Sequence, residues 1–441
     1  MSPIKDQWES PDGSVRLILG DCLHCLPLFE ENTFDAVAVD PPYGLGEQPD
    51  MTDVLTQWLA TGEYAGKSKK GFMGKAWDAF VPGPRAWREV FRVLKPGGHA
   101  VVFAGTRTFD LMGIALRMAG FKLRDTLMWI HGQGFSKGLN LKRLELCSCI
   151  QAGQPAGEPA DIRDARSPLD AGTLRGRGAC PSCGKMRQEY KGFSTQLKPA
   201  WEPILLVRKP LSEPTVAANV LRWGTGALNI EACRVEAEPE LAKNWHRNQS
   251  KAAEEGRNAM NGGLMAIDLR SYTPQGRWPG NVTHDGSPQV LAGFPVTGVS
   301  SGGITPRKTE FLQGVKANGD DMRMTGNRGG LGDTGSAARF FYCAKSSRND
   351  RGEDNRHPTV KSTELMRWLL RLITPPDGLV LDCFLGSGST AVAAYNENFR
   401  IIGIEQEREY WEIAVRRVRA ELERFPLFEQ AAKPRQRELI P

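Results

Sequence analysis

The chain has 441 residues, about three times the usual length of one domain, so a large core with insertions or a second domain is expected. Hydrophobic residues make up 40% and charged residues 24%, and no run approaches the roughly 20 apolar residues of a membrane helix, which argues against a membrane protein. Fifty-seven basic and 51 acidic residues give a net charge of +6, which permits a polyanionic partner without requiring one. The first ten residues contain no apolar run, so we expect no secretory signal and a cytoplasmic location.

Strands and helices alternate in the first third of the chain. Short apolar runs predict strands, and apolar residues at helical spacing, bounded by Pro and Gly, predict helices. The expected strands are 15–20, 34–39, 99–104 and 126–130, and the expected helices are 85–94 and 108–119. Residues 95–98, Lys-Pro-Gly-Gly, are expected to end the first of these helices. This alternation is typical of an α/β doubly wound sheet.

Two long stretches interrupt this pattern. Residues 143–195 are rich in Gly, Pro and Arg and contain four cysteines. Residues 210–338 are polar and Gly-rich, with basic and aromatic residues interleaved. Between them, 201–208 has the apolar pattern of one more strand. We interpret the two stretches as insertions in a single core.

Regular structure returns near the end of the chain. We expect helices at 362–373 and 410–424, strands at 379–381 and 401–404, and a further helix after the glycine-rich turn that ends at Thr390. Glycines let the backbone approach a ligand, and a helix N-terminus offers unpaired N–H groups, although a turn with only a packing role would look similar. Glu405, at the end of the next strand, could accept both hydroxyls of a ribose. Together these features favour an adenosine-containing cofactor.

The tetrapeptide Asp40-Pro41-Pro42-Tyr43 follows the second strand. Two prolines restrict φ and donate no N–H, so their carbonyls are held rigidly beside a carboxylate and an aromatic ring. A plain turn rarely needs all of these. A planar base with an amino group does, because its ring stacks and its N–H groups need acceptors.

These motifs resemble those of the amino-group DNA methyltransferases that use S-adenosylmethionine. The matching residues are Asp40 to Tyr43, Phe384-x-Gly386-x-Gly388 and His357-Pro358-Thr359-x-Lys361, and the likeness covers about 15–209 and 338–419, apart from the Cys-rich stretch. The target motif comes first and the cofactor motif last, which is the order of the β group, a circularly permuted form of the class I methyltransferase sheet. Cys383 and Ser389 stand where the family usually has Pro and Thr.

The resemblance implies a role for each matching residue. Asp40 and the Pro41 carbonyl would accept hydrogen bonds from the target amine, Pro42 would belong to the same catalytic turn, and Tyr43 would stack on the flipped base. Glu405 would bind the ribose. The implied cofactor-binding residues are Asp21 beside the adenine, Lys361 near the cofactor carboxylate, and Asp382, Phe384, Gly386, Gly388, Ser389, Thr390 and Glu405.

The expected activity is methylation of an exocyclic amine in double-stranded DNA. Cytosine-N4 members more often carry Ser at the position of Asp40, which favours adenine N6 and leaves cytosine N4 open. Protein-glutamine methyltransferases typically begin the tetrapeptide with Asn and place the cofactor motif first, and a non-enzymatic DNA-binding protein would need neither motif. The assembly state, a homodimer among the options, and a restriction partner stay open.

Four cysteines in the first insertion form a separate pattern. They are Cys147-x-Cys149 and Cys180-x-x-Cys183, two pairs that favour a closed, structural zinc site over free thiols.

Taken together, these patterns divide the sequence into six regions. They are the tetrapeptide half (1–142), the Cys-rich insert (143–195), a return strand (196–209), a target-recognition region (210–338), the cofactor half (339–425) and a tail (426–441).

Overall fold

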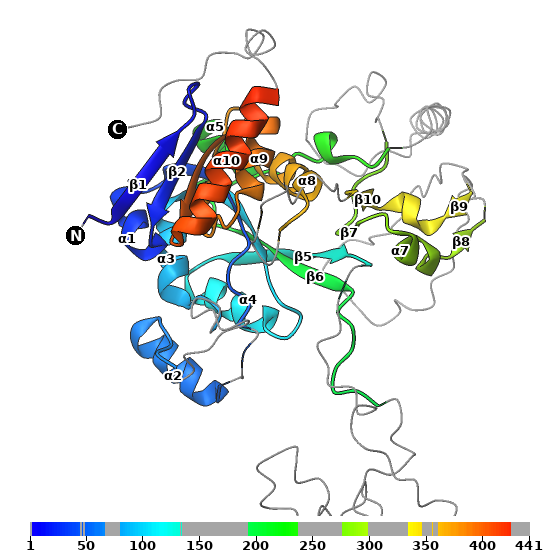
Figure 1. The fold of residues 1–441 in the computed structure, drawn as a ribbon, viewed down its shortest axis with the longest axis horizontal. Coiled ribbons are helices and arrows are strands. Elements are labelled where there is room, and N and C mark those ends of the chain that lie inside the picture. The colour runs from blue at the N-terminus through cyan, green and yellow to red at the C-terminus, as the bar shows by residue number, and fades with distance from the viewer. Residues whose placement is uncertain are drawn as a thin grey trace, which may run out of the picture. The chain divides into compact units, whose positions relative to one another are not determined.

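The computed structural model describes residues 2–44, 46, 49–66, 80–132, 134, 193–236, 276–298, 334–345, 355 and 360–424. The chain forms two compact units, one made of Met1–Gly132 with Trp201–Pro441 and the other of Gln133–Ala200. All helices and strands named below belong to the first unit (Figure 1). In the part of the chain that is described, no helix is long and apolar enough to span a bilayer.

A large mixed sheet forms the centre of this unit. Among the described residues its ten strands are, in spatial order, β1 (Ile4–Glu9), β2 (Val15–Gly20), β12 (Arg400–Glu405), β11 (Leu379–Asp382), β3 (Phe34–Val39), β4 (Leu94–Phe103), β6 (Trp201–Arg208), β5 (Lys122–Ile130), β7 (Val282–His284) and β10 (Tyr342–Cys343). Neighbours pair in parallel except at β1, which is antiparallel to β2, and at β6, which is antiparallel to both β4 and β5. Strands β12 and β11, from the end of the chain, thus lie between β2 and β3, from its beginning.

Helices cover both faces of the sheet, because alternate strand residues point to opposite sides. Leu17 and Ala36 pack in one hydrophobic core, and their neighbours Ile18 and Val37 pack in the other. Helices α8 (Thr363–Ile373), α9 (Ser389–Asn396) and α10 (Arg408–Arg424) contribute to the first core and lie together in Figure 1. The second core includes side chains of α1 (Cys22–Cys25), α2 (Met51–Thr61), α3 (Pro84–Val93) and α4 (Phe109–Met118).

Shorter elements complete the described part of the unit. They are η1 (Leu26–Leu28), α5 (Val216–Trp223), η8 (Glu231–Cys233), α7 (Pro288–Gly293), the paired strands β8 (Val296–Thr297) and β9 (Gly335–Ser336), and η10 (Ala337–Phe340). Two pieces of the stretch 210–338 contact the central sheet. Strand β7 pairs with β5, and the buried Asn219 of α5 donates hydrogen bonds to the carbonyl oxygens of Pro96, at 2.9 Å, and Thr225, at 2.8 Å.

The elements expected from the sequence are found, with shifts at their ends. Strands β2, β3 and β6 have the expected bounds. The expectation that 95–98 would separate helix from strand is wrong, because β4 begins at Leu94, directly after α3. The extra residues form an irregularity in the β3–β4 register, with Gly97 at a φ of 78°. Strand β1 and helix α2 were not expected, because β1 is a largely polar edge strand and α2 follows a Gly-rich segment.

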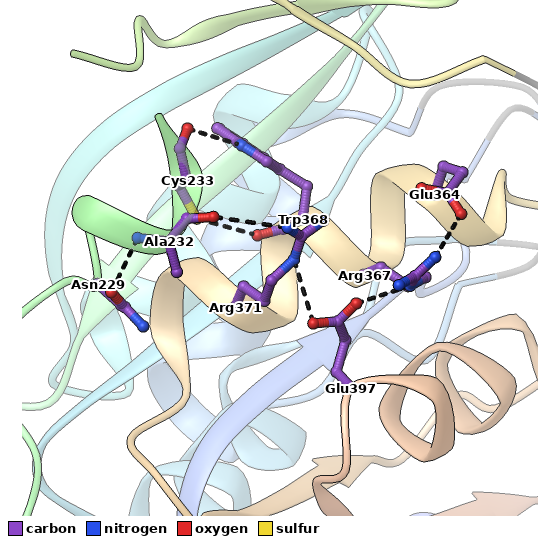
Figure 2. Close-up of polar contacts among 8 residues, drawn as sticks. All are labelled: Asn229, Ala232, Cys233, Glu364, Arg367, Trp368, Arg371 and Glu397. Carbon is purple, nitrogen blue, oxygen red and sulfur yellow. Dashed lines mark hydrogen bonds and ion pairs between the residues drawn. The ribbon is translucent and has the colours of Figure 1, made fainter. Parts of the chain in front are cut away.

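Helix α8 is held firmly on both sides (Figure 2). Arg367 Nε lies 2.6 Å from Glu397 Oε1, and Arg371 Nε lies 3.2 Å from Glu397 Oε2, so two ion pairs join α8 to the residue after α9. On the other side, the indole N–H of the buried Trp368 donates to the carbonyl oxygen of Cys233 at 3.2 Å. Lys361 precedes α8 by two residues, so these contacts also restrict the position of its backbone.

Candidate functional site

Four carboxylates lie at one edge of the sheet. Asp21 follows β2, Glu405 ends β12, Asp382 ends β11, and Asp40 follows β3. These strands are consecutive and parallel, so their carboxyl ends meet at the same edge. In open α/β sheets this edge is where ligands bind. The two distant parts of the chain that carry the sequence motifs are therefore combined in one site.

The turn after β3 presents an unpaired acceptor. The Thr108 hydroxyl donates to the Tyr43 carbonyl oxygen at 2.6 Å, which fastens the end of the turn to the start of α4. Asp40 Oδ1 is buried, and no described residue donates a hydrogen bond to it. A buried carboxylate oxygen without a donor is unfavourable, so the turn is suited to a ligand that brings an N–H group.

Lys361 lies between two carboxylates. Its Nζ is 3.1 Å from Asp40 Oδ2 and 2.9 Å from Glu202 Oε2. It also donates to the Tyr43 hydroxyl at 3.0 Å, and that hydroxyl donates to Glu202 Oε2 at 3.2 Å. The ring centroids of Tyr43 and Phe103 lie 5.2 and 4.9 Å from Nζ, within cation–π range. Among the described residues, the polar partners of Lys361 thus come from the turn and from β6.

Burial and mutual charge shift the pKa values in this cluster. Burial raises the pKa of Asp40 above its usual value, against the attraction of Lys361, and Glu202 adds to the rise. For Lys361, burial alone would lower the pKa, but Asp40 and Glu202 outweigh it and raise the pKa. Burial opposes ionisation of Glu202 too, yet Lys361 lowers the pKa of that carboxyl, helped by His131 and Tyr43. We therefore describe Lys361 and Glu202 as charged.

Sequence reasoning did not single out Glu202. It is the second residue of β6, in the segment Trp-Glu-Pro-Ile-Leu-Leu-Val-Arg, whose apolar pattern predicts only a core strand. The available signal was an acid placed directly before Pro203 and a run of four buried apolar residues. Its proximity to Asp40 depends on strand order, because β6 inserts between β4 and β5.

The glycine-rich turn connects β11 to α9. Gly386 and Gly388 have φ values of 54° and 82°, which side-chain-bearing residues rarely adopt. A Cβ on Gly388 would also lie 2.8 Å from the Cβ of Ala414 in α10, so glycine is required there for packing as well. Phe384, half-buried, contributes to the second core, with its ring centroid 6.0 Å from that of Trp87. Glycine at these two positions is therefore favoured by the backbone conformation, and at 388 also by packing against α10.

Glu405 supports this turn from the neighbouring strand. Its Oε2 accepts from the Gly386 N–H at 2.7 Å and its Oε1 from the Glu407 N–H at 2.8 Å. Asp382 similarly accepts from the Phe384 N–H at 3.0 Å. Burial raises the pKa of both Glu405 and Asp382 to about 7, despite these hydrogen bonds. Each carboxylate oxygen of Glu405 keeps further lone pairs for a ligand hydroxyl.

The remaining expected cofactor residues take local structural roles. Asp21 caps α1, with its Oδ1 accepting from the Leu23 N–H at 2.8 Å. Ser389 and Thr390 begin α9, and Arg417 of α10 donates to the Ser389 hydroxyl at 3.2 Å. Thr390 hydrogen-bonds Asp382 and partly offsets the rise in its pKa. The contacts of Ser389 and Thr390 thus join the end of the glycine-rich turn to α10 and to β11.

Several expected site residues lie outside the described residues. They are Cys147, Cys149, Cys180 and Cys183 of the expected zinc site, and His357, Pro358 and Thr359. In the portion of the chain that is described, no group of three or more His, Cys, Asp or Glu side chains is arranged to bind a metal.

Comparison with known proteins agrees with the motifs. Residues 34–416, from β3 to α10, match the family model N6_N4_Mtase, described as DNA methylase. The chain is 37% identical over 82 residues to the type II methyltransferase M.BglI of Bacillus subtilis, covering 19% of this chain and 22% of that protein. It is 41% identical over 68 residues to M2.DpnII of Streptococcus pneumoniae, covering 15% of this chain and 25% of that protein. The matched segments thus span about a quarter of the length of these relatives.

Among solved structures, the M1.HpyAVI–SAM complex aligns with 91% of this chain and 99% of its own, at 14% identity and a TM-score of 0.34. The family assignment accordingly rests on the sequence match, which includes the Asp40 turn, Glu202, Lys361 and the glycine-rich turn. The chain belongs to the N6/N4 DNA methylase family.

Proposed function

We propose that this chain is a site-specific DNA methyltransferase that transfers a methyl group from S-adenosylmethionine to the exocyclic amine of a base flipped out of double-stranded DNA. The single observation that carries this proposal is the buried Oδ1 of Asp40, an acceptor without a donor among the described residues. It lies at the sheet edge that also carries the glycine-rich turn and Glu405. An exocyclic amine brings the missing N–H.

The residues present fit the cofactor. Gly386 and Gly388 give the turn its left-handed backbone conformation, and α9, whose N-terminus offers unpaired N–H groups, begins directly after them. Glu405, with free lone pairs at a strand end, is suited to the two ribose hydroxyls, and Asp21 on the adjacent strand to the adenine side. Phe384 would bound the pocket on its apolar side. When bound, S-adenosylmethionine supplies an electrophilic methyl group whose C–S bonding electrons stay on sulfur after transfer.

The chain's own residues then act on the target amine. Asp40 Oδ1 and the Pro41 carbonyl accept its two N–H groups, which keeps the nitrogen lone pair directed away from these acceptors and towards the methyl carbon. Positive charge develops on the nitrogen as the new N–C bond forms, and the carboxylate of Asp40 stabilises it. One amine proton is lost to Asp40 or to water. Tyr43 offers an aromatic face to the extruded base.

Adenine N6 is the target we propose, because an Asp rather than a Ser begins the tetrapeptide. Cytosine N4 is the alternative, and the same acceptors would serve it. A protein-glutamine methyltransferase is disfavoured by the initial Asp and by the motif order, and a DNA-binding protein without activity by the assembled acceptor site.

We further propose that the sheet is a circularly permuted class I methyltransferase sheet. The cofactor strands β11 and β12 come last in the chain but lie between β2 and β3, which supports this assignment. The stretch 210–338 is proposed to read the DNA sequence, and the cysteines of 143–195 to bind a structural zinc ion, for which the support is their spacing. A cytoplasmic location stays a prediction.

The test is methyl transfer by the purified full-length chain. A random-sequence duplex DNA pool would be incubated with S-adenosylmethionine carrying a tritiated methyl group, and the DNA digested to nucleosides for mass spectrometry. We expect N6-methyladenine in the DNA and none with Asp40→Ala. N4-methylcytosine in the DNA would identify cytosine as the target base. If a protein substrate were added to the same reaction, label found in that protein and not in the DNA would overturn the proposal.

A further inference from the structure

We infer that Glu202 and Lys361 form a positioning pair that sets both the orientation and the charge of Asp40. This inference rests on the proposed methyl transfer. It gives Lys361 a role different from the cofactor contact implied by the family resemblance, and it assigns a role to Glu202, which no motif singled out.

Lys361 determines the orientation of the Asp40 carboxylate. Lys361 Nζ contacts Asp40 only through Oδ2, at 3.1 Å, so the hydrogen bond fixes which oxygen faces the lysine. The other oxygen, Oδ1, is the buried acceptor without a described donor. Losing the lysine would leave the Tyr43 hydroxyl as the remaining hydrogen-bond partner of the carboxylate, so rotation about χ2, a broad terminal sp²–sp³ torsion, would be less restricted.

Glu202 in turn determines the position of the Lys361 ammonium group. A lysine side chain is a flexible chain of four carbons, and one ion pair would not hold its ammonium group in a single position. Here Glu202 Oε2 accepts from Nζ at 2.9 Å, and Tyr43 and Phe103 enclose the same nitrogen with their rings. Glu202 itself stands on a rigid element, because β6 pairs along its length with β4 and β5.

The combined charge of the three side chains affects how strongly Asp40 attracts the target amine. When Asp40 is ionised, the side chains of Asp40, Glu202 and Lys361 carry two negative charges and one positive charge, so the cluster then has a net charge of −1 beside the amine. A lysine paired with Asp40 alone would neutralise it and weaken its attraction for a developing positive charge. Glu202 shares the lysine and so preserves the acceptor strength of Asp40. Three further titratable groups lie near these charges. They are Tyr43 on the turn, Asp382 at the end of β11, and His131, whose Nε2 lies 3.9 Å from Glu202 Oε1.

The experiment compares Glu202→Gln, Lys361→Met and the double variant with the wild-type full-length chain. Glu202→Gln keeps the shape of the side chain and is the variant least at risk of misfolding. We expect kcat to fall by roughly tenfold or more in each single variant, while the Kd for S-adenosylmethionine changes less than about threefold. A large loss of cofactor affinity in Lys361→Met would overturn the inference in favour of the cofactor contact.

The pH profile of kcat separates positioning from mere structural support. Removing Glu202 takes away a negative neighbour that raises the pKa of Asp40, so the acidic limb should move to lower pH. Removing Lys361 takes away the positive neighbour, so the limb should move to higher pH. The double variant should lose less activity than the product of the single losses, because Gln at position 202 relieves the repulsion left in Lys361→Met.

Two exposed substitutions serve as matched controls, Glu412→Gln on α10 and Lys122→Met on β5, and neither should move the profile. Equal shifts of the limb in both single variants, or strictly multiplicative losses, would overturn the inference. Absence of methyl transfer in the wild type would instead overturn the proposed function, so the two failures are distinguishable.

Discussion

Replacing Asp40 by Asn should nearly abolish methyl transfer while leaving the fold and the cofactor site in place. Because Lys361 needs an acceptor at the position of Oδ2, the Asn carbonyl is expected to face the lysine and the amide NH₂ to face the target amine. The acceptor for the amine is then lost. A hydrogen bond to a charged group contributes about 2 kcal/mol. Half a unit of positive charge about 4 Å from a carboxylate, at an effective dielectric constant of about 20, contributes roughly 2 kcal/mol more.

The two effects together amount to about 4 kcal/mol, so kcat should fall by roughly 1,000-fold. Single-turnover transfer of a tritiated methyl group to DNA measures this loss, and calorimetry should find the affinity for S-adenosylmethionine within a few-fold of wild type. Asp6→Asn is the matched control, because Asp6 is an exposed residue of the edge strand β1 whose ion pair with Arg408, at 3.1 Å, is also exposed. Turnover of Asp40→Asn within tenfold of wild type would refute the role of Oδ1 as the acceptor.

Three further predictions concern the cofactor, the metal and the recognition region. Because burial raises the pKa of Glu405 from 4.5 to about 7, cofactor affinity should increase as pH rises through 7, and Glu405→Gln should bind roughly tenfold more weakly without this pH dependence. The native state then binds more protons than the unfolded state between those two values, so the free energy of unfolding without cofactor should fall as pH rises from about 4.5 to 7, a slope that Glu405→Gln should reduce in urea titrations. Metal analysis of protein purified without chelator should find one zinc per chain, and Cys180→Ser should lose it; a trace of zinc in the wild type would indicate free thiols. Exchanging 210–338 with the corresponding segment of a relative of different specificity should move the methylated sequence, whereas an unchanged site would place recognition in another part of the chain.

Much of the core could be predicted from local sequence. Runs such as 15–20, 34–39 and 201–208 are apolar enough to be buried strands in any α/β context, and their bounds agree with the structure. The two chemical motifs were also local, since each lies in one turn after one strand. Features with weak apolar signal were missed, as in the polar edge strand β1, and the direct passage from α3 into β4 depends on the register irregularity opposite β3.

The sequence by itself determined which residue types are available at each strand end: the acid, prolines and aromatic of one turn, and the glycines and following acid of another. Only the tertiary structure decided which of them meet. Strand order inserts β11 and β12 between β2 and β3, and it brings Glu202 of β6 within hydrogen-bond distance of Lys361, 159 residues away in the chain. The physical reason is that pairing between distant strands, and the burial of a lysine between two acids, depend on packing across the whole sheet and leave no periodic pattern in the local sequence.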